Sequence, residues 1–496
     1  MNTNRQPIRL LLTALITLAL LLPEQAFAEV PYNGYTWDRT GSDIHSINGY
    51  IYKSSIDGVD LPTGVFKNPE SIFVAEDDSI YIVDSGNSRI VHLDRDHQLV
   101  RVYADTDGPG ALSEPKGVFV KSDGTLYVAD TKNQRIAVFD PDGSFQKEFP
   151  APSNELLGST FSYSPSKLVL DKRDYMYIAS DGNNQGLIQI DPTGAFRGFY
   201  GANHVGFSWY RLFIRLVASD EQRAKLRAVQ PAEFSNLDID ESGFIYTTTL
   251  GVTANHLKRL SPVGVDTLNV GIDRIYGDRF TFGPFMTSTF MGITVDRDGL
   301  ISALDLQTGK VFQYDKLGNF LFAFGGIGEQ NGLFVTPSDL NQNSKGDIYV
   351  VDKGRGRVDI FETTPFADLV HGASKLYVDG RYTESEVMWR KVLTYSANFD
   401  LAYLAIGKSL YKAERYQEAM HYYKLANNRD EYSTAFREYR KTFMREHFAI
   451  IFIGVILLLV VVRWGVPYLY RSAARFFSES SSGRRHQSSP RKEEAL

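Results

Sequence analysis

The stretch Pro115–Phe149 decides the fold, because it holds four short strands separated by tight turns. It reads PKGVFVKSDGTLYVADTKNQRIAVFDPDGSFQKEF, in which alternating β-branched and aromatic residues are interrupted by Asp-Gly and Pro-Asp-Gly turns. Such alternation between turn signals predicts an antiparallel β-sheet. Four short strands in roughly 40–50 residues are typical of one blade of a β-propeller.

The same arrangement occurs six times along the chain, with variable gaps between the copies. In each copy an anchor residue begins a strand, and a short apolar run ends fifteen residues after it. The anchors are Pro69, Pro115, Pro165, Phe234, Phe290 and Pro337, and the runs are Ile80–Asp84, Leu126–Asp130, Met176–Ser180, Ile245–Thr249, Ile301–Asp305 and Ile348–Asp352. A constant offset inside repeated units indicates a repeat array. The sequence therefore predicts an all-β six-bladed propeller over residues 66–362.

The sixth unit has only three strands, which end near Phe361. A lead-in segment, residues 29–65, precedes the first unit and contains a strand-like stretch, Ile47–Ile56, that has no blade of its own. Pairing the two ends of the array would remove its free strand edges. We expect Ile47–Ile56 to supply the outer strand of blade six and so to close the ring.

An insertion, residues 202–231, separates the third unit from the fourth. Its pattern is amphipathic and helical. Such a loop lies on the propeller face where small ligands usually bind. The insertion is therefore either a helix packed over the channel mouth for stability, or a lid or partner-docking helix. In the second interpretation its candidate contact residues are Trp209, Tyr210, Arg211 and Arg215.

Between residues 363 and 446 the hydrophobic period becomes helical. A shift of 34 residues aligns small residues with small and aromatic with aromatic: Ala373 with Gly407, Ser385 with Ala419, and Trp389 with Tyr423. That period is typical of tetratricopeptide-like helical repeats. Two repeats are fewer than usually fold alone. We therefore expect this all-α module to pack on the propeller or on a partner.

Both ends of the chain carry membrane signals. Residues 1–28 have two arginines, an apolar stretch and a small-x-small site, which predicts a signal peptide cleaved before Glu29, with an uncleaved anchor as the alternative. Residues 447–470 are long and apolar enough for a transmembrane helix, with a buried soluble helix as the alternative. The Ser- and Arg-rich tail, residues 471–496, has no apolar pattern and is expected to be disordered. We expect a single-pass cell-membrane protein with its propeller and helical repeats outside and its tail in the cytoplasm.

The blades resemble NHL repeats. The resemblance rests on Pro115-Lys116-Gly117, Leu126-Tyr127-Val128-Ala129-Asp130, Asn133 and Arg135-Ile136 in the second unit, with Pro69, Asp84, Asn87, Arg89, Pro337, Asp352 and Arg357 at matching places. Units three and four depart from it, because Ser180 and Thr249 replace the aspartate. The whole layout is similar to that of exported, membrane-anchored NHL-repeat proteins of Gram-positive bacteria. This resemblance implies a link to carbohydrate uptake.

Two sets of recurring polar residues are candidates for a site. Three pairs stand in register, Asp84/Arg89, Asp130/Arg135 and Asp352/Arg357. Their recurrence at equivalent places favours structural ion pairs between neighbouring strands or blades over ligand contacts. The second set is Asn87, Asn133 and Asn183, which lie in loops of the presumed ligand face and offer donors and acceptors to a polar ligand such as a glycan. Asparagine is also a preferred turn residue.

Composition argues against several kinds of chemistry. The chain has no cysteine, which excludes disulfides and thiolate sites. A net charge of −6 provides no excess of basic residues for binding nucleic acid. The nine histidines form no pair at metal spacing, so we expect neither a metal site nor a cofactor. Acidic turns such as Asp296–Gly299 and Asp238–Asp240 invite a calcium interpretation, but they lack the remaining ligands and fit hairpin turns better.

These observations predict a non-enzymatic binding or scaffolding protein that engages a membrane-embedded or surface protein, or a glycan. The alternative is a metal-dependent propeller enzyme of the lactonase or lyase type, and a third is a signalling receptor. Strand direction adds one expectation. If blade six ends on its third strand, the helices leave from the face that holds the Asp-Gly turns. The candidate ligand face then points away from the helices and the membrane.

Overall fold

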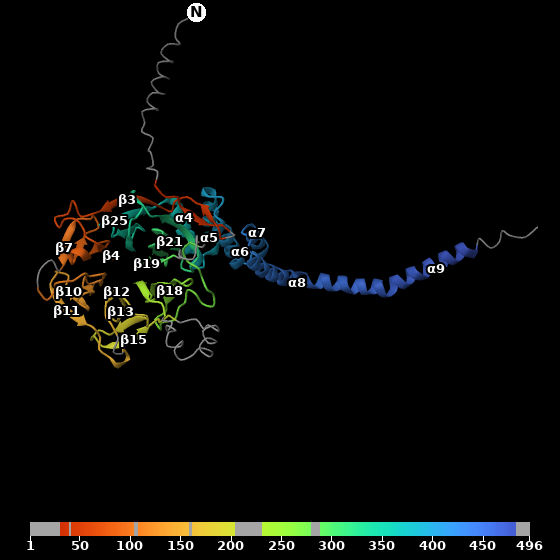
Figure 1. Ribbon diagram of the computed structural model, residues 1–496. Helices are drawn as coiled ribbons and strands as arrows, with labels where there is room; N and C mark the ends of the chain where they lie inside the picture. The colour runs from red at the N-terminus through yellow and green to blue at the C-terminus, as the bar shows by residue number, and fades with distance from the viewer. Residues whose placement is uncertain are drawn as a thin grey trace, which may run out of the picture. The chain divides into compact units, whose positions relative to one another are not determined.

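The computed structural model describes residues 30–38, 41–103, 108–157, 161–203, 231–278 and 288–482. The chain divides into two compact units, Met1–Ile406 and Gly407–Leu496. The first unit contains a six-bladed β-propeller, whose outermost strands lie at the rim in Figure 1. The second is helical. The predicted signal peptide, residues 1–28, lies outside the described residues.

Each blade is a small antiparallel sheet whose strands follow one another in the sequence. Blade one is β4 (Pro69–Val74), β5 (Ile80–Asp84), β6 (Arg89–Leu93) and β7 (Leu99–Tyr103); blade two is β8 (Gly117–Val120), β9 (Leu126–Asp130), β10 (Arg135–Phe139) and β11 (Phe145–Pro150); blade three is β12 (Pro165–Leu170), β13 (Met176–Ser180), β14 (Leu187–Ile190) and β15 (Phe196–Tyr200). Blade four is β16 (Phe234–Ile239), β17 (Ile245–Thr249) and β18 (Leu257–Leu260); blade five is β19 (Phe290–Val295), β20 (Ile301–Asp305), β21 (Lys310–Tyr314) and β22 (Phe320–Gly325); blade six begins with β23 (Pro337–Gln342), β24 (Ile348–Asp352) and β25 (Arg357–Thr363).

The first strands of the six blades form the inner ring. Each of them contacts its two neighbours in the order β4, β8, β12, β16, β19, β23 and back to β4. The second strand of every blade is buried at all five of its positions. Blades cover this strand on both faces, so both sets of alternating side chains meet apolar neighbours. This burial on both faces explains why the repeated runs consist mainly of apolar residues.

The lead-in segment closes the ring. Strand β3 (Tyr50–Ile56) pairs antiparallel with β25 and completes blade six, with Val358 opposite Ile56 and Thr363 opposite Tyr50. This is the place that the sequence assigns to Ile47–Ile56. The lead-in also reaches blade five, which the sequence does not predict. There β1 (Tyr35–Trp37) pairs with β22 and with β2 (Asp43–His45), giving a six-stranded sheet.

Blade four has three strands in its described part. In place of a fourth strand, side chains cover much of the edge of β18. The Asn269 amide donates to the Leu257 carbonyl (2.8 Å), and the Thr267 hydroxyl donates to the Arg259 carbonyl (3.0 Å). Because an unpaired strand edge invites association with other chains, this covering explains how the blade tolerates a shortened sheet.

Five helices follow the propeller: α4 (Pro365–Val378), α5 (Tyr382–Tyr395), α6 (Asp400–Lys412), α7 (Tyr416–Leu425) and α8 (Arg429–Val460). Small residues stand where helices come close together. The Ser385 hydroxyl donates to the Ala373 carbonyl at 2.8 Å, and a Cβ on Gly407 would lie only 2.7 Å from the Tyr423 ring. The aligned positions of the 34-residue shift therefore meet at these crossings.

Helix α8 continues through a π-turn, η3 (Val461–Gly465), into α9 (Val466–Ser482). Pro467 explains the π-turn, because proline lacks an N–H and its ring crowds the carbonyl four residues earlier. The segment Arg429–Arg475 is long and apolar enough to cross a membrane. The expectation of a disordered tail from residue 471 is wrong in part, since α9 runs to Ser482. Residues 483–496 lie outside the described part of the chain.

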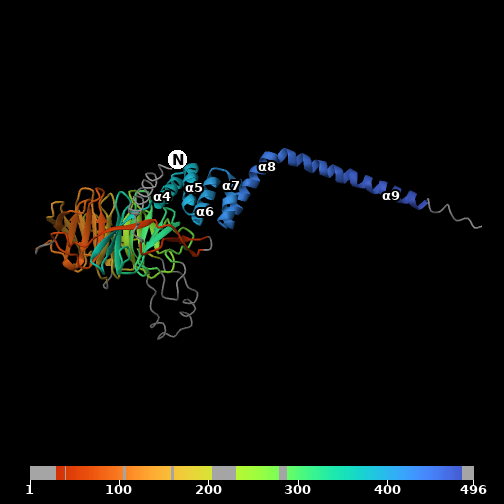
Figure 2. The ribbon, with the colours of Figure 1, turned by 90° about the horizontal axis from the view of Figure 1, so that it is seen from above.

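Helix α4 lies against the propeller (Figure 2), where several polar contacts attach it. The Nε2 atom of His371 lies 2.6 Å from Oε1 of Gln313. Gln313 is fully buried in β21 and donates to Tyr50 at 3.0 Å. Lys375 binds Asp298 at 2.6 Å, and Ser374 donates to Asp315 at 3.4 Å. Both aspartates belong to hairpin turns, so α4 lies on the face that holds these turns, as strand direction predicts.

We predict that the attachment of α4 weakens in acid. Burial lowers the pKa of His371 to about 4, against which Asp298 acts in the opposite direction. The unfolded chain binds this proton near pH 6.5, so the stability falls as the pH decreases from 6.5 toward 4, by up to roughly 3 kcal/mol. Denaturation of the full-length protein in detergent between pH 7.5 and 4 measures the effect. His371→Gln should flatten the pH dependence, and His421→Gln, at an exposed position, should not. Equal slopes for all three proteins would contradict the prediction.

Candidate functional site

The repeated aspartates fasten four of the blades to the loops that lead into them. Asp84, Asp130, Asp305 and Asp352 are fully buried. Their carboxylates accept backbone N–H groups from the incoming loop: Lys67 to Asp84 (2.7 Å), Ser113 to Asp130 (2.8 Å), Thr289 to Asp305 (2.7 Å), and Val335 and Thr336 to Asp352 (2.9 and 3.0 Å). In blade three Ser180 does the same work, accepting from the N–H of Ser164 at 2.9 Å.

The predicted ion pairs differ between blades. Arg89 binds Asp84 and Arg135 binds Asp130, both at 2.8 Å between neighbouring strands. The third pair, Asp352/Arg357, does not form. Arg355 binds Asp352 instead, at 2.7 Å, and Arg357 binds Asp359 at 2.8 Å. Arg355 stands at the position of Asn87 and Asn133, whose amides bind the repeated aspartate in blades one and two. Arg357 binds Asp359, where those blades have Val91 and Ala137.

The predicted asparagines are held inside their own loops. The side-chain amides of Asn87 and Asn133 donate to Asp84 and Asp130, each at 2.8 Å. The amide of Asn183 donates to the Gly186 carbonyl at 2.7 Å. Their donors are therefore used in shaping the loops. The insertion residues Trp209, Tyr210, Arg211 and Arg215 lie outside the described residues.

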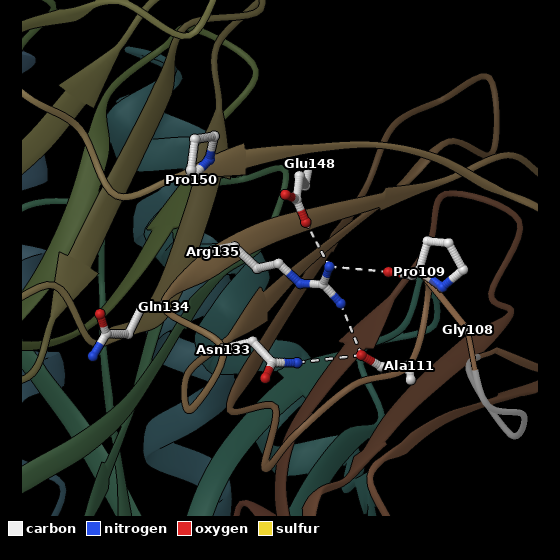
Figure 3. A pocket seen from close by; sticks show the side chains of 8 residues that line it. All are labelled: Gly108, Pro109, Ala111, Asn133, Gln134, Arg135, Glu148 and Pro150. Carbon is white, nitrogen blue, oxygen red and sulfur yellow. Dashed lines mark hydrogen bonds and ion pairs between the residues drawn. The ribbon is translucent and has the colours of Figure 1, made fainter.

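One shallow pocket of about 460 Å³ lies on blade two and includes two of the predicted positions (Figure 3). It is lined by Gly108, Pro109, Ala111, Asn133, Gln134, Arg135, Glu148 and Pro150. The Arg135 guanidinium donates to the carbonyls of Pro109 and Ala111 and to Glu148. With Asp130 on its Nε, the charge of Arg135 is balanced by two carboxylates. The side chain of Gln134 points away from this cluster. The pocket is thus polar without carrying a free positive charge.

A second set of residues, four polar and two glycine, lies at equivalent positions of the inner strands around the propeller axis. These residues stand two positions after the anchors, and they are Ser71, Gly117, Lys167, Asn236, Gly292 and Asp339. In five of the six blades the pairing of the first two strands shifts between the anchor and this position. Such a β-bulge re-aims the side chain that follows it. The bulges therefore direct one residue from each of these blades toward the axis.

Asp339 is the centre of this axial cluster. Its carboxylate binds Lys167, from the opposite blade, at 2.5 Å. It also accepts the Ser71 hydroxyl at 2.5 Å and the Asn236 amide at 2.7 Å. Lys167 donates to Ser71 as well, at 2.7 Å. Ser71, Asn236 and Asp339 are each less than 5 % exposed. Blades one, three, four and six are thus joined through one buried carboxylate.

Glycine occupies the remaining two positions of the ring because there is no space for a side chain. A Cβ on Gly292 would lie 2.6 Å from a methyl group of Leu340, and one on Gly117 would lie 2.4 Å from the Ser166 carbonyl oxygen. Contacts this short are repulsive, so the neighbouring inner strands can approach only where these two residues are glycine.

Asp238 stands two residues farther along β16 than Asn236, so the two side chains leave the strand on the same side. Burial raises the pKa of Asp238 to about 6, even though Ile239, Val295 and Thr294 donate hydrogen bonds to its carboxylate. A carboxyl group that titrates near neutral pH can accept a proton as a general base. The sequence analysis considered Asp238 only as part of an acidic turn. Its place four residues after the anchor Phe234, in step with the position of Asn236, is the signal that could have singled it out.

The acidic turns are built as hairpins. In Asp296–Gly299 one carboxylate oxygen of Asp296 accepts the N–H groups of Asp298 and Leu300, at 2.9 and 2.8 Å. This is the geometry of an Asx turn. Within the described residues, no group of three or more histidine or acidic side chains is placed to hold a metal ion.

Comparison with known proteins supports the fold. The NHL repeat family model matches residues 112–139, which lie in blade two. A search of curated proteins finds no match. Similar solved structures include virginiamycin B lyase from Staphylococcus aureus (13% identity, TM-score 0.40, covering 63% of this chain and 100% of that one) and a candidate gluconolactonase (16%, 0.40, 64% and 93%). A third is the extracellular domain of a candidate hybrid two-component system from B. thetaiotaomicron (13%, 0.38, 67% and 40%).

These structures correct one expectation. The sequence led us to expect a protein without enzymatic activity, yet the propellers that resemble it include a lyase and a candidate gluconolactonase. The prediction that the chain is not an enzyme is therefore contradicted. At identities of 13–16% the resemblance assigns neither activity to this chain.

We predict that the axial cluster is a main source of propeller stability. Asp339→Ala leaves the Lys167 ammonium buried without its partner, which should lower the free energy of unfolding by roughly 3–5 kcal/mol. Adding Lys167→Met should recover part of this loss, because the unpaired charge is then gone. As a control, Glu384→Ala breaks the exposed Arg381–Glu384 pair and should change stability by less than about 1 kcal/mol. A loss from Asp339→Ala as small as that of the control would show that the cluster contributes little.

Proposed function

We propose that the protein is an extracytoplasmic binding platform, anchored in the cell membrane, that presents its propeller and helices to a partner protein or a glycan. The observation that carries the proposal is the docking of α4. Phe366 contacts Phe322 with ring centroids 6.2 Å apart, and the Thr364 hydroxyl donates to the Asn48 carbonyl at 2.8 Å. Together with the His371–Gln313 contact, these interactions fix the first helix of the module on the ring.

The pocket on blade two favours a neutral polar ligand. Because two carboxylates balance the Arg135 guanidinium, an anion would gain little there. The partly exposed Glu148 carboxylate offers a hydrogen-bond acceptor beside the apolar surface of Pro109 and Pro150. Sugars match such a lining, because they carry hydroxyl groups around an apolar ring face. In our proposal the ligand is a glycan, which agrees with the link to carbohydrate transport implied by the NHL resemblance.

The helices supply the surface for a protein partner. We read them as tetratricopeptide-like repeats, a class whose repeats bind other proteins. On α5, Val387 and Tyr395 are 51% and 55% exposed, which is unusual for large apolar side chains. The partner is a membrane-embedded or surface protein, because in our proposal the apolar helix holds the module close to the membrane. The propeller and the helices lie outside, and the tail lies in the cytoplasm.

We predict that a partner can be captured from outside intact cells. A membrane-impermeant, amine-reactive crosslinker applied to the native host should join lysines within residues 363–446 to one stoichiometric membrane or surface protein, identified by mass spectrometry. Val387→Glu combined with Tyr395→Glu should reduce recovery of that protein at least tenfold. The matched pair Gln417→Glu with His421→Glu, at exposed positions of α7, should leave it unchanged. Crosslinks that form only after the cells are permeabilised would contradict the proposed orientation, and equal recovery with both variants would exclude this surface.

A second candidate function is catalysis in the channel, and Asp238 is the observation that favours it. As a general base its carboxylate would take a proton from the water that attacks a bound lactone and return it to the ring oxygen that leaves. If it does, turnover of a sugar lactone by the full-length protein should rise with pH through about 6, the pKa of this group. Asp238→Asn should lower the rate at least a hundredfold, and Asp240→Asn, at the adjacent turn, should not. An activity that Asp238→Asn leaves intact would eliminate this role.

A further inference from the structure

A stripe of aromatic side chains runs along α8 before the helix becomes apolar. Tyr432, Phe436, Tyr439 and Phe443 follow one another at spacings of four, three and four residues. Tyr432, Phe436 and Phe443 are 38%, 44% and 42% exposed. Their rings follow the helix as a ladder, with centroids 6.5 Å apart for Tyr432 and Phe436 and 6.1 Å for Tyr439 and Phe443. Large aromatic groups are thus left open to water in one narrow line.

The other faces of this part of α8 either pack against α7 or carry charged residues. Ala435 is fully buried and is the side that meets α7. Charged residues cover the face opposite the stripe, where Lys441 and Arg437 both bind Glu438. An exposed helix with a single apolar line at alternating spacings of four and three residues has the pattern of a coiled-coil seam. Three of the four rings on this seam remain exposed in the described structure.

The lipid bilayer is too thin to cover the whole aromatic stripe. With a rise of about 1.5 Å per residue, Phe436 stands roughly 18 Å along the helix from Phe448, where the apolar run begins. The headgroup layer on each side of a bilayer is only about 5–8 Å thick. Phe443 can reach this layer in a helix that stands upright, but Phe436 and Tyr432 cannot. Their partner must therefore be a protein surface that rises from the membrane beside α8.

The same seam continues into the apolar segment. Its positions there are Ile450, Ile453, Leu457 and Val460, so a partner helix that follows the stripe downward enters the membrane at the same level. We propose that this partner is α8 of a second copy, packed in parallel. Two copies match with no offset, because each presents the same stripe at the same height above the same span, as a twofold interface requires. Glu446 is the one charged seam position, and a polar group in a seam sets register and copy number at some cost in stability.

The absence of native cysteine makes this pairing directly testable, because any disulfide must join two introduced residues. Full-length single-cysteine variants are oxidised in the membrane with copper phenanthroline. Phe436→Cys and Phe443→Cys should give at least fivefold more covalent dimer than Thr434→Cys and Lys441→Cys, which lie on the opposite face. Equal yields at all four positions would overturn the proposal. So would a seam cysteine that neither forms dimers nor reacts with maleimide, since a different protein would then cover the stripe.

A second measurement does not depend on oxidation. The mass of the full-length protein in nanodiscs should correspond to two copies, and Phe436→Glu combined with Phe443→Glu should reduce it to one. The matched variant Thr434→Glu with Lys441→Glu should remain a pair. A wild-type protein that is monomeric, or a seam variant that stays paired, would refute the inference without bearing on the ligand of the propeller.

Discussion

Closing six blades into a ring forces the inner strands to share one axis, and their polar side chains can be satisfied only by one another. The chain meets this constraint with one carboxylate. The carboxylate of Asp339 binds the ammonium group of Lys167, the hydroxyl of Ser71 and the amide of Asn236, which come from three other blades. Buried polar groups left without partners would each cost roughly 1–3 kcal/mol. The glycines at the two remaining ring positions make the arrangement sterically feasible, since any side chain there would separate the strands.

The same constraint explains why the fold was easier to predict than the site. The repeated runs and their fixed offset depend on local strand pairing, so the blades and the closing role of Ile47–Ile56 can be read from the chain. The contacts of the axis join residues far apart in sequence: Lys167 and Asp339 are 172 residues apart, and Ser71 and Asp339 are 268 apart. No local pattern distinguishes these residues from ordinary polar residues at the start of a strand. Only their common place, two residues after each anchor, marks them.

Two other predictions from the sequence, the Asp352/Arg357 pair and the disordered tail, failed for local reasons. Arg357 stands opposite Asp352 in the strand pairing, as its blade-one and blade-two counterparts do, yet Arg355 takes the carboxylate. Arg355 replaces the asparagine that binds the aspartate in blades one and two, and Arg357 binds Asp359, which has no acidic counterpart in those blades. In the same way, the tail after residue 470 has too little apolar character to suggest order. It is helical because it extends a helix that has already formed, which removes the cost of nucleation.

The pairing of β3 with β25 has a consequence for how this protein is made. The Thr364 hydroxyl and the Asn48 carbonyl that end this joint are 316 residues apart. During synthesis β3 therefore stays without its partner β25 until nearly the whole propeller has emerged, and its edges are unpaired meanwhile. Contacts between such distant segments slow folding, and open edges of this kind aggregate. Newly made chains thus pass through a vulnerable period that ends only with closure. A folding factor would act most usefully in that interval.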